Sequence, residues 1–350
     1  MKYGSLSFPT FLLIGALLGA DSASSEVFRV SSAGDADFTE IQPAIDAASD
    51  GDLIYVLPYH SLDQRYLGFT VDGKSLTIRG EGRPHILTRP AIVRSIPLGG
   101  TVVLDGLDMN RSSLPGYDYH GALWHQPGLT ISDCQGAVRL FDCSAEGREH
   151  ERVWAGLQLI NALDVAATSC TFIGGRADRD HPSGAAGLQS IASRIALYGS
   201  TVRGGHGTGW YGGTAGHSGG PGMTMAARSV AWLVNSTITG GVGASTHCSA
   251  CPDHPGDGGA GISVQTGSIC FESDCTIAGG EGSPEDPLGP AGSPGAATVG
   301  LVQSSPGATV PFECERALRS GDAAPVRIEG TPGETVRIAV ARGGGFRFLG

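Results

Sequence analysis

Lysine is almost missing from this chain of 350 residues, because only Lys2 and Lys74 are lysine and arginine supplies the remaining positive charge. A lysine acting as a catalytic base is therefore restricted to Lys74 once the chain is processed. Charged residues make up only 16% of the sequence and aromatic residues only 7%. Acidic residues outnumber basic ones by 34 to 23, and the net charge of −11 would repel phosphate backbones and anionic lipids. This balance argues against nucleic acid as a partner.

Long apolar runs are also missing, apart from Phe11–Ala20 near the start of the chain. Lys2 precedes this run and small residues follow it, which is typical of an export signal over residues 1–24. The alternative is a buried N-terminal helix. The run is too short to span a bilayer, and no later segment looks transmembrane, so the mature chain is expected to have no membrane anchor. Eight cysteines in an exported chain favour disulfides.

Glycine and proline are abundant, with 56 and 20 residues, and this predicts a chain of strands and turns. One short helix is expected after a strand at Val27–Val30. Asp37 or Thr39 marks its start, with Glu40 and Gln42 at capping-box spacings. Its apolar stripe is formed by Ile41, Ala44, Ile45 and Ala48. Because Pro43 is acceptable only in a first turn, the helix should begin near Thr39 and end before Asp50.

The sequences DFTEIQPAIDAASDGDLIYVLP and KSLTIRGEG, which fall within residues 37–82, resemble the N-terminal cap and first turn of pectin-methylesterase-like and pectate-lyase-like β-helix proteins. The resemblance implies a right-handed parallel β-helix of the pectin-lyase-like superfamily, with the amphipathic helix covering the open end of the coil. An uncovered end would expose the core and an unpaired strand edge.

An internal repeat points to the same architecture. Four units, at 155–175, 186–205, 221–241 and 260–280, align in one frame, and 128–143 fits as an earlier unit. Apolar residues alternate within each unit, as in half-buried strands, and only the Gly-rich segment after each unit varies in length. Stacked coils would bury one continuous column and tolerate such variation on one flank. A β-propeller or a β-sandwich is the alternative.

The repeat also predicts columns of cysteines. Cys143 and Cys170 occupy equivalent positions in adjacent units, and Cys275 and Cys314 are 39 residues apart, which is one further period. Adjacent rungs are about 4.8 Å apart, which a disulfide accepts. Disulfides and reduced thiols packed in the core remain equal alternatives for these two pairs.

The catalytic motifs of the resembling families are incomplete here. There is no Gln-Asp dipeptide as in the esterases, no WxDH-like strand as in the lyases, and of the polygalacturonase motifs only Gly205-His206-Gly207 is present. The best local candidate is Asp105, Asp108 and Arg111, because two Asp and an Arg suffice to bind calcium and abstract a proton beside a uronate carboxylate. The alternative is a strand followed by a Gly turn.

The segment HCSACPDH places His247, Cys248, Cys251 and His254 in an order suited to zinc. A disulfide between Cys248 and Cys251 is the preferred interpretation in an exported chain.

Trp210 and Tyr211 stand out in another Gly-rich segment, where flat rings could stack on sugar faces. The alternative is that they fold back over the flank of the coil.

These observations predict a signal over residues 1–24, a right-handed parallel β-helix over 25–320 and a short C-terminal β segment over 321–350. The preferred function is an exported, noncatalytic protein that presents its Gly-rich segments for surface attachment or for recognition of a carbohydrate or protein. The rival hypothesis is a polysaccharide lyase, hydrolase or esterase with an unfamiliar active site. Calcium is the cofactor that the candidate catalytic residues suggest.

Overall fold

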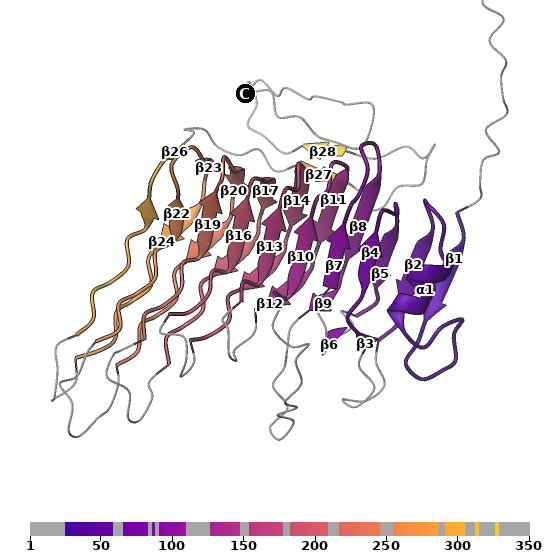
Figure 1. The fold of residues 1–350 in the computed structure, drawn as a ribbon, viewed down its shortest axis with the longest axis horizontal. Coiled ribbons are helices and arrows are strands. Elements are labelled where there is room, and N and C mark those ends of the chain that lie inside the picture. The colour runs from indigo at the N-terminus through magenta and orange to yellow at the C-terminus, as the bar shows by residue number, and fades with distance from the viewer. Residues whose placement is uncertain are drawn as a thin grey trace, which may run out of the picture.

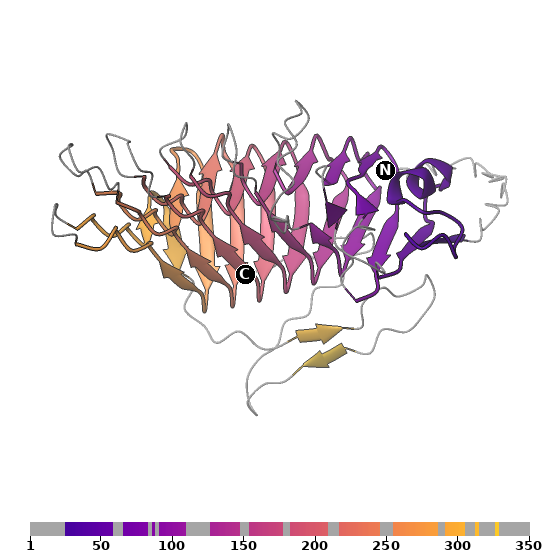
Figure 2. The ribbon, with the colours of Figure 1, turned by 90° about the horizontal axis from the view of Figure 1, so that it is seen from below.

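The computed structural model describes residues 25–58, 66–82, 86–87, 91–109, 127–147, 154–177, 183–208, 217–245, 255–285, 291–304, 312–314 and 326–328. Its described part is a right-handed parallel β-helix in which three parallel sheets run along one axis (Figures 1 and 2). The fold predicted from the repeat is therefore confirmed. Among the described residues, no helix has both the length and the apolar character needed to cross a membrane.

The largest sheet has ten strands in continuous parallel order. They are β1 (Val27–Val30), β2 (Leu53–Val56), β5 (Thr77–Gly80), β8 (Thr101–Asp105), β11 (Ala137–Phe141), β14 (Asp164–Thr168), β17 (Arg194–Tyr198), β20 (Val230–Val234), β23 (Ile269–Ser273) and β26 (Val302–Ser304).

Two further parallel sheets complete the coil. The eight-stranded sheet consists of β4 (Thr70–Asp72), β7 (Ala91–Arg94), β10 (Leu129–Ser132), β13 (Leu157–Ile160), β16 (Leu188–Ile191), β19 (Met223–Ala226), β22 (Ile262–Val264) and β25 (Thr298–Val299). The six-stranded sheet consists of β9 (Asp108–Met109), β12 (Ser144–Glu146), β15 (Thr171–Ile173), β18 (Thr201–Arg203), β21 (Thr237–Thr239) and β24 (Thr276–Ala278).

Two small sheets lie outside this pattern. Strand β3 (Tyr66–Leu67) pairs in parallel with β6 (Ile86–Leu87), and β27 (Phe312–Cys314) pairs antiparallel with β28 (Val326–Ile328). Neither is hydrogen-bonded to the three main sheets in the described strand order.

Equivalent residues of the repeat lie directly over one another. Val165 pairs with Ile195, and Ile195 pairs with Ala231, so the column predicted from the alignment is confirmed. Alternate residues of each strand point inward, and those of β14 and β17 are at most 3% exposed. Burying one such aliphatic or aromatic side chain contributes about 1.5–3 kcal/mol, so each coil is stabilised mainly through its inner face.

Short corners join the sheets, and the corner between the ten-stranded and six-stranded sheets is only two residues long. Its first residue has a positive φ in successive coils, as at Asp142, Gly199 and Asn235, with values of 50°, 53° and 46°. Glycine, Asn and Asp enter this left-handed region most readily. The Gly turn expected after Asp105 is this corner, since Gly106 has a φ of 65°.

The second corner residue points inward and forms a column of small sulfur and hydroxyl side chains. Its members are Cys143, Cys170, Ser200, Ser236 and Cys275. Each serine Oγ accepts a hydrogen bond from the backbone N–H of the preceding coil, as Ser200 does from Cys170 at 3.1 Å. The serines of the column therefore accept hydrogen bonds from corner N–H groups that are not bonded within the sheets.

The described cysteines of the coil are free thiols, so the structure has reduced sulfur at Cys143 and Cys170 although the predicted shared column is confirmed. Burial raises the pKa of Cys143 well above its usual value, whereas a hydrogen bond from Cys143 lowers the pKa of Cys170. Burial likewise raises the pKa of Cys270 to about 12. Buried protonated thiols behave as small apolar side chains.

The prediction that Cys314 continues the column of Cys275 is wrong. Cys314 belongs to β27, which pairs antiparallel with β28 instead of adding a strand to the coil. The last strand in the ten-stranded sheet is β26, which ends at Ser304. The 39-residue spacing therefore does not correspond to a rung.

Helix α1 (Ile41–Ala47) covers the N-terminal end of the coil with Ile41, Ala44 and Ile45, all buried, as predicted. The predicted capping box is wrong, because the N-cap is Glu40 and makes no side-chain cap hydrogen bond. Glu40 instead accepts from the Leu67 backbone N–H at 2.9 Å.

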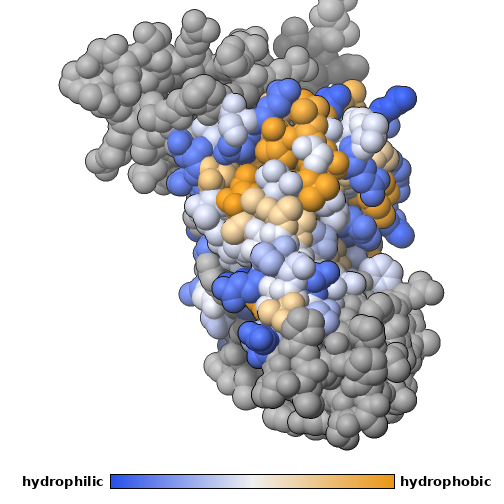
Figure 3. All heavy atoms as spheres, turned by 90° about the vertical axis from the view of Figure 1, so that its left-hand side faces the viewer, coloured by the Kyte–Doolittle hydropathy of each residue, from blue (hydrophilic) through white to orange (hydrophobic). Residues whose placement is uncertain are grey.

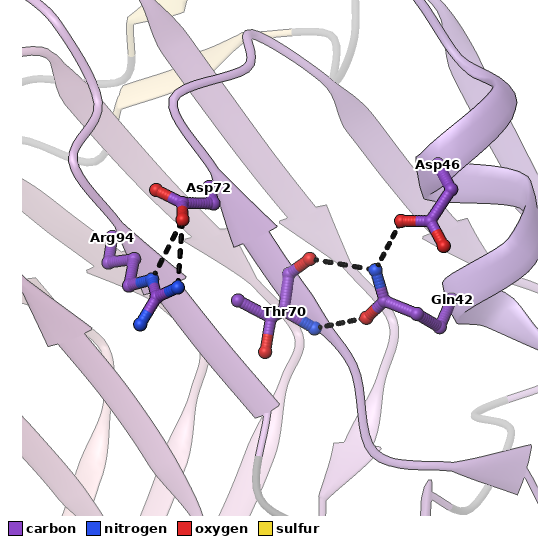
Figure 4. A network of polar contacts seen from close by, with 5 residues as sticks. All are labelled: Gln42, Asp46, Thr70, Asp72 and Arg94. Carbon is purple, nitrogen blue, oxygen red and sulfur yellow. Dashed lines mark hydrogen bonds and ion pairs between the residues drawn. The ribbon is translucent and has the colours of Figure 1, made fainter.

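Gln42, the other residue of the predicted capping box, binds the first strand of the eight-stranded sheet (Figure 4). Its Oε1 accepts from the Thr70 N–H at 2.7 Å, and its Nε2 donates to the Thr70 carbonyl at 3.2 Å and to Asp46 at 2.8 Å. The helix thereby satisfies backbone groups at an edge strand.

Lys74, the one lysine of the described chain, is also part of this cap. Its Nζ donates to the carbonyl oxygens of Ile45, Asp46 and Ala48 at 2.8, 3.1 and 2.8 Å. A cation is favourable at a helix C-terminus, where carbonyls lack intrahelical partners. Lys74 thus has a structural role rather than the role of a base.

The C-terminal end of the coil differs, because no described helix covers it. Val299 and Leu301 are 49% and 52% exposed, and Ile277 is half-buried. Figure 3 views the molecule from this end and shows apolar residues gathered on its last coil.

Candidate functional site

The structure places the two predicted acidic residues on different sheets. Asp105 ends β8 and lies on the outer face of the ten-stranded sheet, and Asp108 begins β9 on the outer face of the six-stranded sheet. The corner at Gly106 separates them. Arg111, the third predicted residue, lies outside the described residues.

Each carboxylate has a partner on an adjacent coil. Asp105 Oδ2 is 3.4 Å from Arg79 Nε, and Asp108 Oδ1 accepts a 2.6 Å hydrogen bond from Ser144 Oγ. Asp105 and Asp108 are only 5% and 8% exposed. These contacts tie successive coils together at the corner, and buried acidic side chains require such partners.

No three His, Cys, Asp or Glu side chains of the described residues gather closely enough to hold a metal ion. The predicted zinc or disulfide residues His247, Cys248, Cys251 and His254 lie outside the described part.

The predicted aromatic residues Trp210 and Tyr211 also lie outside the described residues, but the residues that flank both Gly-rich segments are described. These flanks form a regular structure of their own, which we call the glycine array.

The glycine array has two layers of extended chain beside the coil. In the outgoing layer the chain leaves the six-stranded sheet, and in the returning layer it comes back to the eight-stranded sheet. The outgoing segments are 174–177, 204–208, 240–245 and 279–285, and the returning segments are 183–187, 217–222, 255–261 and 291–297. In Figure 1 their described parts extend side by side from the coil toward the lower left.

Hydrogen bonds within each layer recur at every third residue. In the outgoing layer Gly204 N–H donates to Thr239 O at 2.9 Å, and Gly207 N–H donates to Val242 O at 2.7 Å. In the returning layer the donors Gly219 and Gly222 follow the same spacing, with both distances 2.8 Å. Three residues per turn is the repeat of the polyproline II conformation, whose backbone groups all point outward and can bind neighbouring chains.

A further chain of hydrogen bonds joins the two layers. Gly220 N–H donates to Gly205 O at 2.7 Å, and Gly241 N–H donates to Gly220 O at 2.7 Å. The same zigzag continues through Gly259, Gly280 and Gly295. Backbone groups rather than side chains therefore hold the array together.

Glycine is required in the array by close approach rather than by backbone conformation. A Cβ added to Gly241 would lie 1.9 Å from the carbonyl oxygen of Gly205, and one added to Gly220 would lie 2.1 Å from that of Ala185. Neither glycine has a positive φ. Any larger residue would force two backbones apart.

One histidine is built into the outgoing layer. His206 Nδ1 accepts a hydrogen bond from the Val242 backbone N–H at 3.1 Å. Burial, with the nearby charges of Arg176 and Arg203, lowers the pKa of His206 below its ordinary value. A neutral ring with Nδ1 unprotonated fits both observations.

The outer edge of the array, where the outgoing segments end and the returning ones begin, is held in register. His217 and Ala244 exchange two backbone hydrogen bonds, of 3.0 and 2.9 Å, and His217 is only 6% exposed. Thr208 Oγ1 donates to Ala177 O at 2.7 Å, one coil back. Further along, Ser283 N–H donates to Gly256 O at 2.9 Å.

This register joins described residues that flank two segments with predicted sites. The segment with Trp210 and Tyr211 ends where His217 begins the returning layer, and the segment with His247 follows shortly after Ala244. Because His217 and Ala244 are hydrogen-bonded, both segments start or end at adjacent positions of the edge. The ordered array itself was not predicted, although the Gly-Gly-x-Gly at 204–207, 240–243 and 279–282, after three of the four units, is a visible signal of it.

A comparison with protein-family models found no match, and neither did a comparison with curated proteins. Among solved structures, pectin methylesterase from carrot is similar at 12% identity, with 71% of this chain and 82% of that chain covered and a TM-score of 0.38. The A-module of the Azotobacter vinelandii mannuronan C-5 epimerase AlgE6 is similar at 14% identity, with 77% and 95% covered and a TM-score of 0.22. The strand topology itself establishes the class, a right-handed parallel β-helix.

Proposed function

We propose that this protein is an exported, noncatalytic β-helix protein that recognises a carbohydrate or protein surface through segments displayed in a row at the edge of the glycine array. The observation that supports this most is the hydrogen-bonded register at His217 and Ala244. It fixes the bases of two segments, one carrying Trp210 and Tyr211 and one carrying the His247–His254 motif.

A rigid base is what such a role requires. Segments on an ordered scaffold lose less conformational entropy on binding than free chains of the same length. Aromatic rings add stacking area against sugars at low entropic cost. The array supplies rigidity mainly through backbone hydrogen bonds, so sequence at the edge is free to vary for recognition.

Binding to a glycan array tests this proposal. The wild-type chain is expected to bind a defined set of glycans without turnover, and Trp210→Ala should lose that signal by at least about tenfold, which corresponds to about 1.4 kcal/mol. Trp232→Ala is the matched control, because Trp232 is a half-exposed tryptophan of the ten-stranded sheet, away from the array. Equal loss in both variants, or binding unaffected by Trp210→Ala, would contradict the proposal.

A second candidate is a polysaccharide lyase, hydrolase or esterase acting near Asp105 and Asp108. It is favoured by the low exposure of both carboxylates and by the arginine beside Asp105. The test is incubation with uronate-containing and neutral polysaccharides, with and without calcium, while unsaturated products and reducing ends are followed. Turnover that Asp108→Asn abolishes, with the coil still folded, would establish this function in place of the first.

A further inference from the structure

The outer faces of the three sheets differ in character. On the eight-stranded sheet, one outward column consists of polar residues in register, namely Thr130, Gln158, Gln189, Thr224 and Ser263. On the six-stranded sheet the corresponding column is Ser144, Thr171, Thr201, Thr237 and Thr276. Both columns carry the hydroxyl and amide side chains expected of a surface in water.

The outer face of the ten-stranded sheet also carries large apolar residues, beside charged ones such as Asp105 and Arg139. Phe141, Tyr198, Trp232 and Phe271 all point outward from it, and we call these four residues the outer aromatic face. Trp232 stacks on Phe271 with ring centroids 6.2 Å apart and an interplanar angle of 13°. Val230, Val234 and Ile269 lie in neighbouring columns.

Apolar outward residues on one side of a solenoid mark a surface that another element covers. Trp232 is only 37% exposed, and the other three are partly buried. Burial also raises the pKa of Tyr198. In the described part of the chain, no helix packs on this face.

The chain that follows the coil is positioned to reach this surface. It leaves from Ser304, the end of β26, which is the last strand of the same ten-stranded sheet. Residues 305–350 then contain β27 and β28, whose backbones lie beside the coil on the side of the ten-stranded sheet (Figures 1 and 2).

The hairpin of β27 and β28 needs an apolar partner. Its register pairs Phe312 with Ile328 and Cys314 with Val326, so these four apolar residues occupy alternate positions of the two strands. Glu313 pairs with Arg327 at the position between them. A two-stranded ribbon alone is marginally stable in water and requires packing against another surface.

The same alternation continues beyond the hairpin in the sequence. Val336, Ile338 and Val340 alternate with other residues, and Phe346 and Phe348 flank Arg347. Such segments have one apolar side, as half-buried strands do.

We propose that the C-terminal segment, residues 312–350, docks its apolar side on the outer aromatic face of the ten-stranded sheet. The segment covers Trp232 and Phe271 and leaves its arginines toward solvent. This interaction is independent of the proposed recognition role, because it uses a different face of the coil from the glycine array.

Limited trypsin digestion of the full-length protein tests the docking, since Arg327, Arg337 and Arg342 lie in the segment. Cleavage at these sites is expected to be at least about tenfold slower in the folded protein than in a synthetic peptide of residues 305–350, because a docked segment must open before it is cut. Equal rates would overturn the proposal without any variant being needed.

Substitution then locates the docking face. Trp232→Glu should accelerate cleavage of the segment by at least about tenfold, since a charge would be buried in the apolar interface. Thr237→Glu is the matched control, because Thr237 lies in the same coil on the exposed outer face of the six-stranded sheet. Acceleration by both variants, or by neither, contradicts the proposal, provided that circular dichroism shows both coils intact.

Light scattering distinguishes docking of the C-terminal segment from the alternative, in which a second copy of the chain covers this face. The docked segment predicts a monomer whose mass is the same in wild type and Trp232→Glu. A dimer that Trp232→Glu dissociates, with the cleavage rate unchanged, would assign the face to self-association instead. Should Trp232→Glu fail to fold, the comparison between folded protein and free peptide still decides the proposal.

Discussion

The coil and the glycine array advance together, one rung per repeat, yet they are held together by opposite means. In the coil, side chains such as Phe172 and Leu197 fill the interior and are fully buried. In the array, backbone N–H and carbonyl groups bind one another directly, as at Gly241 and Gly220. Buried side chains stabilise the coil, whereas the array requires glycine because a side chain would separate its backbones.

The two regions therefore tolerate different substitutions. The coil accepts any apolar residue of suitable size at an inward position, as the column Val165, Ile195, Ala231 shows. The array accepts only glycine where two backbones meet.

The largest effect is expected from Gly241→Val in the array. Its Cβ would lie 1.9 Å from the carbonyl oxygen of Gly205, a backbone atom that cannot rotate away. We expect a loss of more than about 5 kcal/mol from the free energy of unfolding, or unfolding of the array alone. Urea denaturation monitored by circular dichroism measures it.

Gly199→Asn is the control for that prediction. Gly199 has a φ of 53°, a Cβ added there would meet no atom within 4 Å beyond its chain neighbours, and Asn235 occupies the equivalent corner one coil later. We expect a change within about 1 kcal/mol, since Asn tolerates this conformation. If both glycine variants were equally mild, close backbone approach in the array would be ruled out.

In the coil, Phe172→Ala should cost about 3–5 kcal/mol, because a fully buried aromatic side chain leaves a cavity. Thr171→Ala, on the outward side of the same strand, should change the free energy of unfolding by less than about 0.5 kcal/mol. Thermal denaturation of both variants gives the comparison. Similar costs for the two would mean that β15 does not present Phe172 to the interior.

A smaller effect is expected at the corner column. Ser200→Ala removes the acceptor of the Cys170 N–H and should cost about 1–3 kcal/mol. Ser200→Cys should be milder, because equivalent corners already carry cysteine. A stability ranking in which the cysteine variant is the worse of the two would show that the column serves packing rather than hydrogen bonding.

The smallest expected effect is the pH dependence of stability that His206 gives the array. The pKa of His206 is lowered in the folded state, so at pH values between the folded and unfolded pKa the unfolded chain binds more protons. Stability is therefore fully present above the unfolded pKa of about 6.5 and declines as the pH falls through it toward the folded pKa. His206→Gln, which keeps an acceptor for the Val242 N–H, should remove this pH dependence in thermal melts. An unchanged profile would exclude His206 as its source.

The coil could be predicted from the sequence because its inward apolar residues recur with a regular period. Val165, Ile195 and Ala231 can be aligned from the amino-acid sequence alone, and so can the column of Cys143 and Cys170. Glu40 and Gln42 are misassigned as capping residues because local spacing cannot reveal that Leu67 and Thr70 come within reach. Cys314 is misplaced because a spacing of one period does not establish that the coil continues.

The array escaped prediction for a physical reason. Its order resides in backbone hydrogen bonds at every third residue, and the recurring glycines mark their positions without showing which chains they join. Of the predicted site residues, Asp105 and Asp108 lie on separate sheets, whereas Trp210 and His247 lie outside the described residues, in segments whose flanking residues His217 and Ala244 are hydrogen-bonded. That adjacency depends on the returning layer, which no local motif encodes.

Hydrogen exchange of the backbone amides would show whether the glycine segments form an ordered array as firmly bonded as the coil. We expect the amides of Gly220, Gly241 and Gly259 to be protected to the same order as that of Leu197 in β17, since each is a donor within the folded structure. Exchange of these glycine amides at the rate of an unstructured peptide, with Leu197 protected, would refute an ordered array.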